Sequence, residues 1–400
     1  MKRKYFFIIL TLFIVFIYVT NITQLPSKVF LLNGEKLNVK TVFGIEIKEK
    51  KKEIQETWQN QNLQTTQMDV TILGGIKVKE ISVTTYPSIK VVPTGNLIGL
   101  KLYTNGVLVI GTSEIQSISG DAIKPFESTS IEEGDTIIEL DSQEIDSTRT
   151  LQTVINNSAG RTLEIKYIKN GEICTSNIKP VQTGSNEYRL GLWVRDSASG
   201  VGTMTFYEPD SKRFAALGHG ISDSDTGNLL DIETGEVVNS KIVNIIKGKK
   251  GFPGEIKGSI SGQATIGAVS NNTDFGIFGE LEENVMTINK YQDGINIALR
   301  EEITLGEATI LATLETGQTE EYTVEITAID LDNNTNNKSM QIKITDERLI
   351  NKTGGIICGM SGAPMIQNNK LIGAITNVLV SDPETGYAVF ADIMIKEMVK

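Results

Sequence analysis

The chain has 400 residues, a formal net charge of −11 and an ordinary hydrophobic content of 40%. An acidic chain lacks the positive surface that nucleic-acid-binding proteins need, and the composition is that of a folded protein rather than a disordered one. A single histidine and two cysteines disfavour a metal enzyme, so we expect neither a metal nor a cofactor.

Three basic residues, Lys2, Arg3 and Lys4, precede an apolar run over residues 5–19. This pattern predicts a signal anchor or transmembrane helix over residues 1–23, because basic flanks stay on the cytoplasmic side and the extended apolar segment is just long enough to span a bilayer. A cleaved signal peptide is the alternative, although no small-residue cleavage site follows. Either way, the rest of the chain would lie outside the cytoplasm.

Residues 24–94 are predicted to form an N-terminal region and linker. Within them, residues 48–67 are rich in Lys, Glu, Gln and Asn, which is typical of a solvated helix or a flexible linker. Residues 68–92 alternate like strands.

Residues 95–182 have the pattern of a compact α+β module. Strand-like segments surround a tight Gly-Asp turn, and residues 147–158 carry apolar side chains at helical spacing. This order resembles a bacterial-type PDZ domain. The resemblance implies that a loop at Ile98, Gly99 and Leu100 holds a peptide C-terminus or an extended segment by strand addition. A small α+β domain without a ligand is the alternative.

Residues 189–400 alternate short apolar strands with Gly, Asn and Asp turns, which favours a sandwich or paired barrels. Near the end, Ser361 lies in Gly-Met-Ser-Gly-Ala-Pro. Small neighbours suit a nucleophile on a tight turn, and the amides of Gly359 and Ser361 could form an oxyanion hole. The segment resembles the serine loop of chymotrypsin-like peptidases; a glycine-rich turn without chemistry is the alternative. For Cys358 a role in core packing is favoured over one as a rival nucleophile.

A serine nucleophile needs a base, and His219 is the one histidine of the chain. It lies between two glycines after an apolar hairpin and precedes Ser361, the order of chymotrypsin-like folds. A lone histidine is often incidental, but this pairing favours the role of base. The residues alone leave the orienting carboxylate open, although a generic layout favours Asp274. The candidates are Asp223, Asp225, Asp274, Asp346 and Asp382.

Several longer segments together resemble the stage IV sporulation protein B family. They are residues 195–209, 216–226, 275–279, 353–364 and 382–387. The resemblance implies a mainly β chain with an N-terminal transmembrane helix, a PDZ domain and a chymotrypsin-like double β-barrel peptidase domain. It also implies a catalytic triad of His219, Asp346 and Ser361, with Asp346 in the segment Ile-Thr-Asp-x-Arg-Leu. Gly220 departs from the family, which more often has a bulky residue there.

The same resemblance implies a serine endopeptidase of sporulation signalling. Such a protein cleaves itself and then the extracytoplasmic part of a membrane regulator, which triggers intramembrane processing of pro-sigma-K. It would be anchored in the forespore inner membrane by its N-terminal helix, with the catalytic part between forespore and mother cell.

Two other hypotheses compete with this one. A non-enzymatic PDZ scaffold at the membrane would keep the peptidase domain as a relic, but an intact Gly-x-Ser-Gly-x-Pro together with the only histidine argues against it. A quality-control protease is disfavoured because those enzymes place the PDZ domain after the protease.

Overall fold

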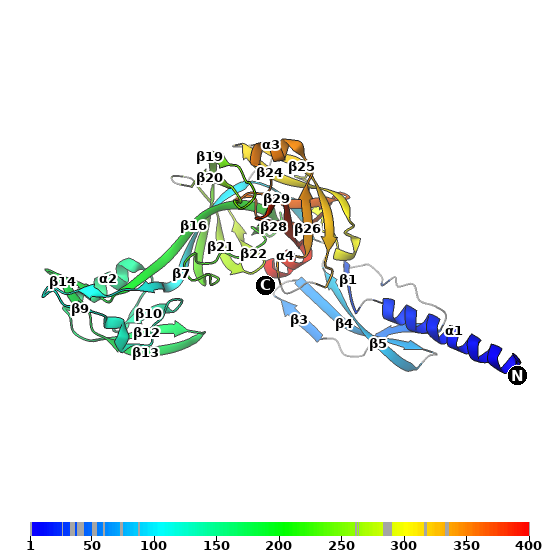
Figure 1. Cartoon of the computed structure of the whole chain (residues 1–400), viewed down its shortest axis with the longest axis horizontal. Helices are drawn as coiled ribbons and strands as arrows, with labels where there is room; N and C mark the ends of the chain where they lie inside the picture. Colours follow the sequence, from blue (N-terminus) through cyan, green and yellow to red (C-terminus); the bar gives the residue numbers. More distant parts are fainter. Residues whose placement is uncertain are drawn as a thin grey trace. The chain divides into compact units, whose positions relative to one another are not determined.

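The computed structural model describes residues 2–25, 27–32, 37, 44–49, 54–58, 61–72, 75–86, 89–260, 262, 264–282, 290–315, 318–332 and 336–399. Most of these residues are in β-strands, and the chain divides into two compact units (Figure 1). The first unit is Met1–Lys90, Asn296–Thr304 and Val399–Lys400, and the second is Val91–Ile295 and Leu305–Met398. Each unit is described by itself.

The first unit contains helix α1 (Lys2–Gln24) and a five-stranded sheet. Its strands are β1 (Lys28–Leu32), β2 (Ile45–Glu49), β3 (Ile54–Trp58), β4 (Gln61–Ile72) and β5 (Ile76–Tyr86), and the unit also holds the 3-10 turn η2 (Arg300–Glu302). The sheet order is β1-β5-β4-β2, and β3 pairs with β4. The solvated helix or flexible linker predicted for residues 48–67 is wrong for residues 48–49, 54–58 and 61–67, because antiparallel pairing of β2 and β3 with β4 holds them in a sheet. Residues 50–53, 59 and 60 lie outside the described residues.

Helix α1 coincides with the predicted transmembrane helix, and that prediction is wrong. Among the described residues, no helix is long and apolar enough to cross a membrane. The helix begins with three basic residues, and Thr20, Asn21 and Thr23 near its end bond to backbone carbonyls of the preceding turn. The apolar part between these ends is shorter than the about 20 residues that a bilayer core requires.

In the second unit, residues 105–191 form an α+β module, whose bounds differ from the expected 95–182. Its elements are β8 (Ile115–Gln116), β9 (Ala122–Ile123), η1 (Pro125–Ser128), β10 (Thr136–Leu140), β11 (Gln143–Glu144), α2 (Thr148–Asn157), β12 (Leu163–Lys169), β13 (Glu172–Ile178), β14 (Val181–Gly184) and β15 (Glu187–Arg189). Ser147 caps α2 by accepting a hydrogen bond from the Thr150 amide. The helix buries Leu151, Val154 and Ile155 in a core shared with the sheet.

The rest of the second unit contains two six-stranded rings. The first ring follows the pairing order β7-β18-β21-β22-β17-β16 and closes because β16 also pairs with β7. Its strands are β7 (Leu97–Thr112), β16 (Leu192–Tyr207), β17 (Arg213–Ala216), β18 (Ile232–Asn239), β21 (Thr265–Thr273) and β22 (Gly276–Leu281). Strand β6 (Lys90–Pro93) pairs with the end of β16, and β19 (Lys241–Ile246) and β20 (Glu255–Ser259) form a separate hairpin. The short strand β23 (Ile295–Asn296) precedes the second ring.

The second ring is a closed barrel in the order β24-β25-β26-β29-β28-β27. Its strands are β24 (Gly306–Glu315), β25 (Gln318–Ile329), β26 (Met340–Ile344), β27 (Pro364–Gln367), β28 (Lys370–Leu379) and β29 (Asp382–Phe390), joined by α3 (Glu347–Thr353) and followed by α4 (Ala391–Met398). The second unit is thus mainly β and rich in barrel structure, as expected.

Two long strands, β7 and β16, run through both the module and the first barrel (Figure 1). The predicted peptide-binding residues lie in the barrel half of β7. Ile98 and Leu100 are each 1% exposed in the barrel core, and Gly99 pairs with β16 on one side and β18 on the other. The expected loop is therefore wrong: both edges of the strand are already occupied, and no peptide can add to it there.

Candidate active site

His219 follows three residues after the end of β17, at a sharp turn. The backbone is left-handed at Leu217 (φ 68°) and Gly218 (φ 70°). A Cβ on Gly218 would lie 3.0 Å from Thr376 and 3.2 Å from Val389, both in the second barrel. Because glycine permits this close approach, His219 lies where the two barrels meet.

The loop that carries Ser361 packs on the same turn from the other side. Gly362 has φ 95°, and a Cβ there would lie 2.0 Å from the carbonyl oxygen of Thr203 and 2.5 Å from the amide nitrogen of Leu217. Only glycine fits so close to two backbone segments. The serine loop and the histidine turn are therefore in direct contact.

Hydrogen bonds fix the serine loop to both barrels. The amide of Thr203 donates to the Ser361 carbonyl at 3.0 Å, and its hydroxyl donates to the Gly359 carbonyl at 2.7 Å. The Ser361 hydroxyl donates to the Thr376 carbonyl at 2.9 Å. In this structure the serine proton is thus directed at a backbone carbonyl rather than at His219.

The His219 ring has the protonation that a general base requires. Its Nδ1 lies 2.8 Å from the Gly220 carbonyl oxygen, which can only accept. The ring proton is therefore assigned to Nδ1, and Nε2 keeps its lone pair. Burial lowers the pKa of His219 below its usual 6.5, and the Gly220 carbonyl only partly offsets this. The imidazole is neutral at pH 7.

The amides around Ser361 fall into two groups. Four of them donate to backbone carbonyls: those of Cys358, Met360, Gly362 and Ala363. The amides of Gly359 and Ser361 have no such acceptor among the described residues. A backbone N–H without a partner is uncommon in a folded protein, and a pair of them beside a serine is the arrangement that binds an oxyanion.

Asp346 is held away from His219 by other partners. It caps the N-terminus of α3, where Oδ1 accepts from the Arg348 amide at 2.9 Å. Its Oδ2 accepts from the Arg348 guanidinium at 2.8 Å and from the Thr323 amide at 3.3 Å. Arg348 lowers the pKa of the Asp346 carboxyl. In the described structure this carboxylate forms no bond with His219.

Asp274, the other candidate, lies on the turn between β21 and β22. A Cβ on Gly220 would be 2.6 Å from the carbonyl oxygen of Thr273, so this turn borders the histidine loop. The Asp274 carbonyl accepts from Asn337 Nδ2 at 3.3 Å, but its side chain is exposed. Within the described residues the site therefore joins the histidine and serine segments without an orienting carboxylate.

Family comparisons identify the family to which the chain belongs. A model described as SpoIVB peptidase S55 matches residues 186–395, and a PDZ domain model matches residues 97–179. The chain belongs to the SpoIVB peptidase S55 family. It is a serine peptidase that also carries a PDZ domain, as the sequence motifs predict. None of the curated proteins matches it.

Solved structures give weaker likenesses to this SpoIVB-family chain. The PDZ domain of the SdrC-like protein from Listeria monocytogenes is 22% identical, covers 22% of this chain and 87% of its own, and has a TM-score of 0.18. The Rv3671c protease from M. tuberculosis in its active form is 14% identical over 50% of this chain and 73% of its own, with a TM-score of 0.29. Its inactive form is 12% identical over 50% and 84%, with a TM-score of 0.26.

The SpoIVB-family site also depends on residues that sequence reasoning did not assign to it. The side chain of Asn272 clamps the loop after His219: it accepts from the Ile221 amide and donates to the carbonyls of Ile221 and Leu230, each at 2.8 Å. The side-chain amide of Asn272 thus bonds to backbone groups at both ends of this loop, as donor and as acceptor. Asn272 lies next to one of the segments that resemble the family, but nothing in the sequence indicated a contact with a loop 51 residues away.

Asp223, considered above as a triad member, has a structural role instead. Its side chain is fully buried and forms an ion pair with Arg195, which also binds Asp225 at 2.6 Å. Although burial alone would raise the pKa of Asp223, the amides of Thr226 and Asp225 and the Arg195 guanidinium outweigh it, so the pKa is lowered. The pair ties the histidine loop to β16.

Cys358 is exposed, so the expected role in core packing is wrong. Its amide and carbonyl bond to Gly254 and Ile256, which aligns the serine loop with β20. Although the residue is exposed as a whole, partial desolvation of its sulfur and then the nearby Glu255 raise the pKa of the thiol. A protonated thiol is a poor nucleophile, which leaves Ser361 as the candidate.

Proposed function

We propose that this SpoIVB-family chain is an endopeptidase in which Ser361 attacks the scissile carbonyl and His219 accepts the serine proton. The observation that carries the proposal is that the amides of Gly359 and Ser361 have no acceptor among the described residues, although the neighbouring amides of the loop are hydrogen-bonded. They would hold the oxyanion of the tetrahedral intermediate. Each donor of this kind typically lowers the barrier by about 3 kcal/mol.

Catalysis requires one change from the arrangement described above. The Ser361 hydroxyl must leave the Thr376 carbonyl and donate to Nε2 of His219. Rotation about the Cα–Cβ bond of Ser361 redirects the hydroxyl in this way. Catalytic hydrogen bonds often form only when substrate is bound. Nε2 is already the unprotonated nitrogen, so the ring need not change tautomer.

We propose Asp346 as the residue that orients His219 in the active form. The family resemblance supports this role, and Asp346 begins the helix that leads into the serine loop. Its carboxylate would have to exchange Arg348 for the imidazole. In the resting arrangement the Gly220 carbonyl fixes the tautomer, but it has no full charge with which to stabilise the imidazolium that forms during the reaction.

The biological setting follows from the family resemblance. The substrate would be the extracytoplasmic part of a membrane regulator that restrains the protease processing pro-sigma-K, and the chain would also cleave itself. Cleavage would take place in the space between forespore and mother cell. The PDZ domain would recruit the substrate or restrain the peptidase.

Labelling with a serine-reactive fluorophosphonate tests the chemistry. Wild-type protein should be labelled, and both Ser361→Ala and His219→Ala should lose the label and the cleavage of a co-expressed regulator. Equal labelling of wild type and Ser361→Ala would contradict the proposal and favour the PDZ scaffold. Cys358→Ala is the matched control in the same loop and should keep the label.

A further inference from the structure

The hairpin formed by β19 and β20 concentrates positive charge in an acidic chain. Its residues 241–259 carry five lysines and one glutamate, whereas the whole chain has a net charge of −11. All five lysines are exposed, and none of them forms an ion pair within the part of the chain that the structure describes. A segment of this kind attracts negatively charged partners.

The tip of this hairpin (residues 249–252) is a tight turn with apolar side chains beside two of the lysines. Lys249 and Phe252 exchange backbone hydrogen bonds of 2.8 and 2.7 Å, so Lys250 and Gly251 form the turn itself. The Gly251 amide donates to the Val380 carbonyl at 2.8 Å. Phe252 is 45% exposed and Val380 is 44% exposed. The hairpin tip therefore presents positive charge and apolar surface together.

The same hairpin lies against the serine loop. The Ile256 amide donates to the Cys358 carbonyl at 2.8 Å, and the Cys358 amide donates to the Gly254 carbonyl at 3.2 Å. A Cβ on Gly359 would lie 3.0 Å from the Ile256 side chain. Because Cys358 is three residues before Ser361, the basic hairpin borders the loop that carries the proposed nucleophile.

Strand β28 connects the proposed nucleophile to the hairpin tip. On one side the strand pairs with β29. On the other side Ile375 bonds to the serine loop, and no described strand pairs with β28 beyond this residue. The open edge starts at Thr376, whose carbonyl accepts from the Ser361 hydroxyl, and it ends beside Val380, which bonds to the hairpin tip. An extended peptide can add to an edge of this kind.

We propose that the hairpin tip binds an acidic segment of the substrate and so selects proteins with carboxylates before the scissile bond. Both described neighbours of β28 are antiparallel to it, and a substrate that pairs in the same sense runs from Val380 towards Thr376. With the scissile bond at Ser361, a substrate residue about five positions before the cut lies beside Val380. Carboxylates at and before that position meet Lys249 and Lys250.

Carboxylates of the chain itself leave the positive charge of the hairpin tip available. Glu255 lies on β20 beside the serine loop, and Asp382 accepts from the Thr385 hydroxyl at 2.7 Å. Neither carboxylate forms an ion pair with Lys249 or Lys250 in the described structure. The two lysines can therefore pair with carboxylates of a bound substrate.

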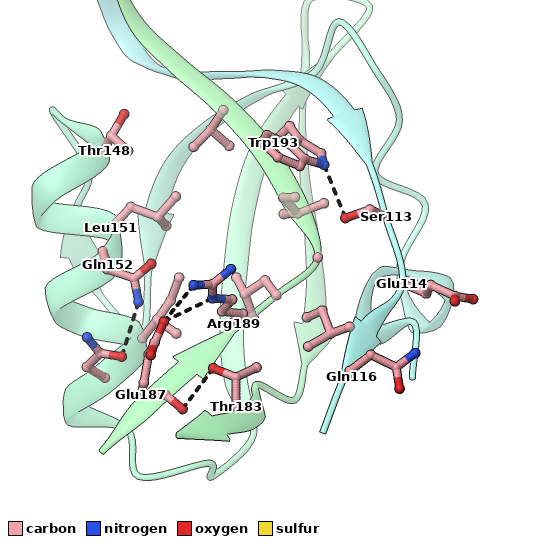
Figure 2. Close-up of a pocket in the computed structure, with 17 residues that line it drawn as sticks. Ser113, Glu114, Gln116, Thr148, Leu151, Gln152, Thr183, Glu187, Arg189 and Trp193 are labelled. Atoms are coloured by element: carbon pink, nitrogen blue, oxygen red, sulfur yellow. Dashed lines mark hydrogen bonds and ion pairs between the residues drawn. The ribbon is translucent and has the colours of Figure 1, made fainter. Parts of the chain in front are cut away.

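The cleft beside α2, shown in Figure 2, differs in this respect. It has a volume of about 920 Å³, and Arg189 is the one cationic residue in its lining. Arg189 is already paired with Glu187 at 2.7 Å, and Glu114 adds a further negative charge. An acidic segment is therefore attracted to the hairpin tip and not to this cleft.

An anionic lipid surface also attracts lysines that lie beside an exposed phenylalanine. A substrate is the favoured occupant because of where the hairpin tip is fixed. Its Gly251 amide bonds to the end of the open edge that starts beside Ser361, a connection that lipid binding does not require.

The selection of cleavage sites rests on the proposed function, and it is measured with a library of random peptides. At cuts made by the wild-type chain, Asp and Glu should be enriched about fivefold or more around the fifth residue before the cut, as expected for two or three exposed charge pairs. Lys249→Glu combined with Lys250→Glu should remove this enrichment and favour Lys and Arg there. Cuts that show no acidic preference would overturn the proposal while leaving the proposed function intact.

A second double variant is the matched control. Lys241→Glu combined with Lys257→Glu makes the same change of charge on the same hairpin, away from its tip. This chain should keep the acidic preference. An equal loss in both double variants would assign the effect to overall charge and refute the role of the hairpin tip.

Binding of an acidic segment is measured without catalysis, on the full chain carrying Ser361→Ala. A fluorescent peptide of six glutamates should bind about tenfold more tightly than one of six lysines, and the difference should shrink in 1 M salt. The two tip substitutions should abolish the difference. Equal binding of both peptides would overturn the docking surface. The expected binding in a chain that cuts no peptide and takes no fluorophosphonate label would contradict the proposed function and leave the docking surface assigned.

Sedimentation with lipid vesicles separates the other source of negative charge. Phosphatidylglycerol vesicles should bind the Ser361→Ala chain no better after its tip lysines are intact than after both are replaced by glutamate. Vesicle binding that depends on these lysines, together with cuts that ignore acidic residues, would assign the hairpin tip to lipid and overturn the proposal.

Discussion

The hydroxyl of Thr203, on β16, donates a 2.7 Å hydrogen bond to the carbonyl of Gly359 in the serine loop. Thr203 is buried, so water does not compete for this hydrogen bond. The bond fixes the orientation of the peptide group between Gly359 and Met360. The orientation of a proposed oxyanion donor loop thus depends on a side chain of the first barrel.

Replacement of Thr203 by valine keeps the side-chain shape and removes this bond. The Gly359 carbonyl is then left unpaired, which costs about 1–3 kcal/mol for a buried acceptor. We expect the fluorophosphonate labelling rate to fall about 5- to 150-fold, which corresponds to this energy. Thr203→Ser retains the hydroxyl and should retain most of the rate. A Thr203→Val chain that labels normally would show that the bond does not orient the loop.

The sole histidine allows a direct test of pH dependence. The pKa of His219 is lowered below 6.5 by burial, so the neutral base persists to more acidic pH than for an exposed histidine. The acid limb of kcat/KM should therefore have its midpoint below 6.5. Below pH 6.5 the unfolded chain binds the proton first, so stability should fall until the folded pKa is reached. His219→Gln should remove that part of the stability loss; an acid limb above 6.5 would contradict the shift.

Replacement of each candidate aspartate by asparagine shows which of the two orients His219. If Asp346 orients His219, Asp346→Asn should lower kcat by about 10⁴-fold, as expected for loss of an orienting carboxylate. Asp274→Asn should then have little effect. If Asp346 only caps α3, Asp346→Asn should leave kcat nearly unchanged and cost little stability, because asparagine caps a helix about as well as aspartate does. Thermal unfolding and burst-corrected kinetics of the two variants distinguish these outcomes.

Gly362 tests the contact between the serine loop and the histidine turn. An alanine Cβ would lie 2.0 Å from the Thr203 oxygen, so Gly362→Ala should separate the two segments and abolish labelling. The control is Gly120→Ala, where φ is 87° but no atom lies within 4 Å of the new Cβ. That variant carries only the backbone strain, about 1–2 kcal/mol, and should label normally. A similar loss of labelling in both variants would assign the effect to backbone strain.

The loop clamp of Asn272 gives a stability prediction. Asn272→Leu removes three hydrogen bonds to backbone groups of Ile221 and Leu230. The Ile221 amide and the Leu230 carbonyl lose the partner described here, whereas the Ile221 carbonyl still accepts from the Leu230 amide at 3.0 Å. At about 1 kcal/mol for each bond, unfolding free energy should fall by about 3 kcal/mol. Hydrogen exchange should increase first at residues 219–230. A variant as stable as wild type would mean that water replaces the amide.

Motifs in the sequence predicted the mainly β fold, the family and the PDZ domain, because glycine-flanked turns and strand alternation are local features. The structure of Ile98, Gly99 and Leu100 could not be predicted from local sequence. Whether these residues form a loop or a barrel strand depends on pairing with β16, about a hundred residues later. The described parts of the polar segment 48–67 were predicted wrongly for the same reason, since backbone pairing rather than apolar periodicity makes them strands.

The site residues likewise differ in how far the sequence alone reveals them. His219 and Ser361 stand out because their chemistry is rare in this chain and their glycines are visible in sequence. Asn272 and Arg195 act through contacts with loops that are distant in sequence, and their residue types are common on any surface. The partners of Asp346 also became apparent only once α3 was in place, because an N-cap is defined by the helix that follows it.

The course of β7 limits how this protein can be dissected. A fragment that begins at residue 186 contains the whole region matched by the peptidase family but lacks the strand that closes the first barrel between β16 and β18. Such a fragment would expose two unpaired strand edges beside the histidine turn. Its inactivity would reveal nothing about the PDZ domain. An informative deletion must retain residues 97–104 and join them by a short turn to β16, so that the domain is removed as an insertion rather than as an N-terminal extension.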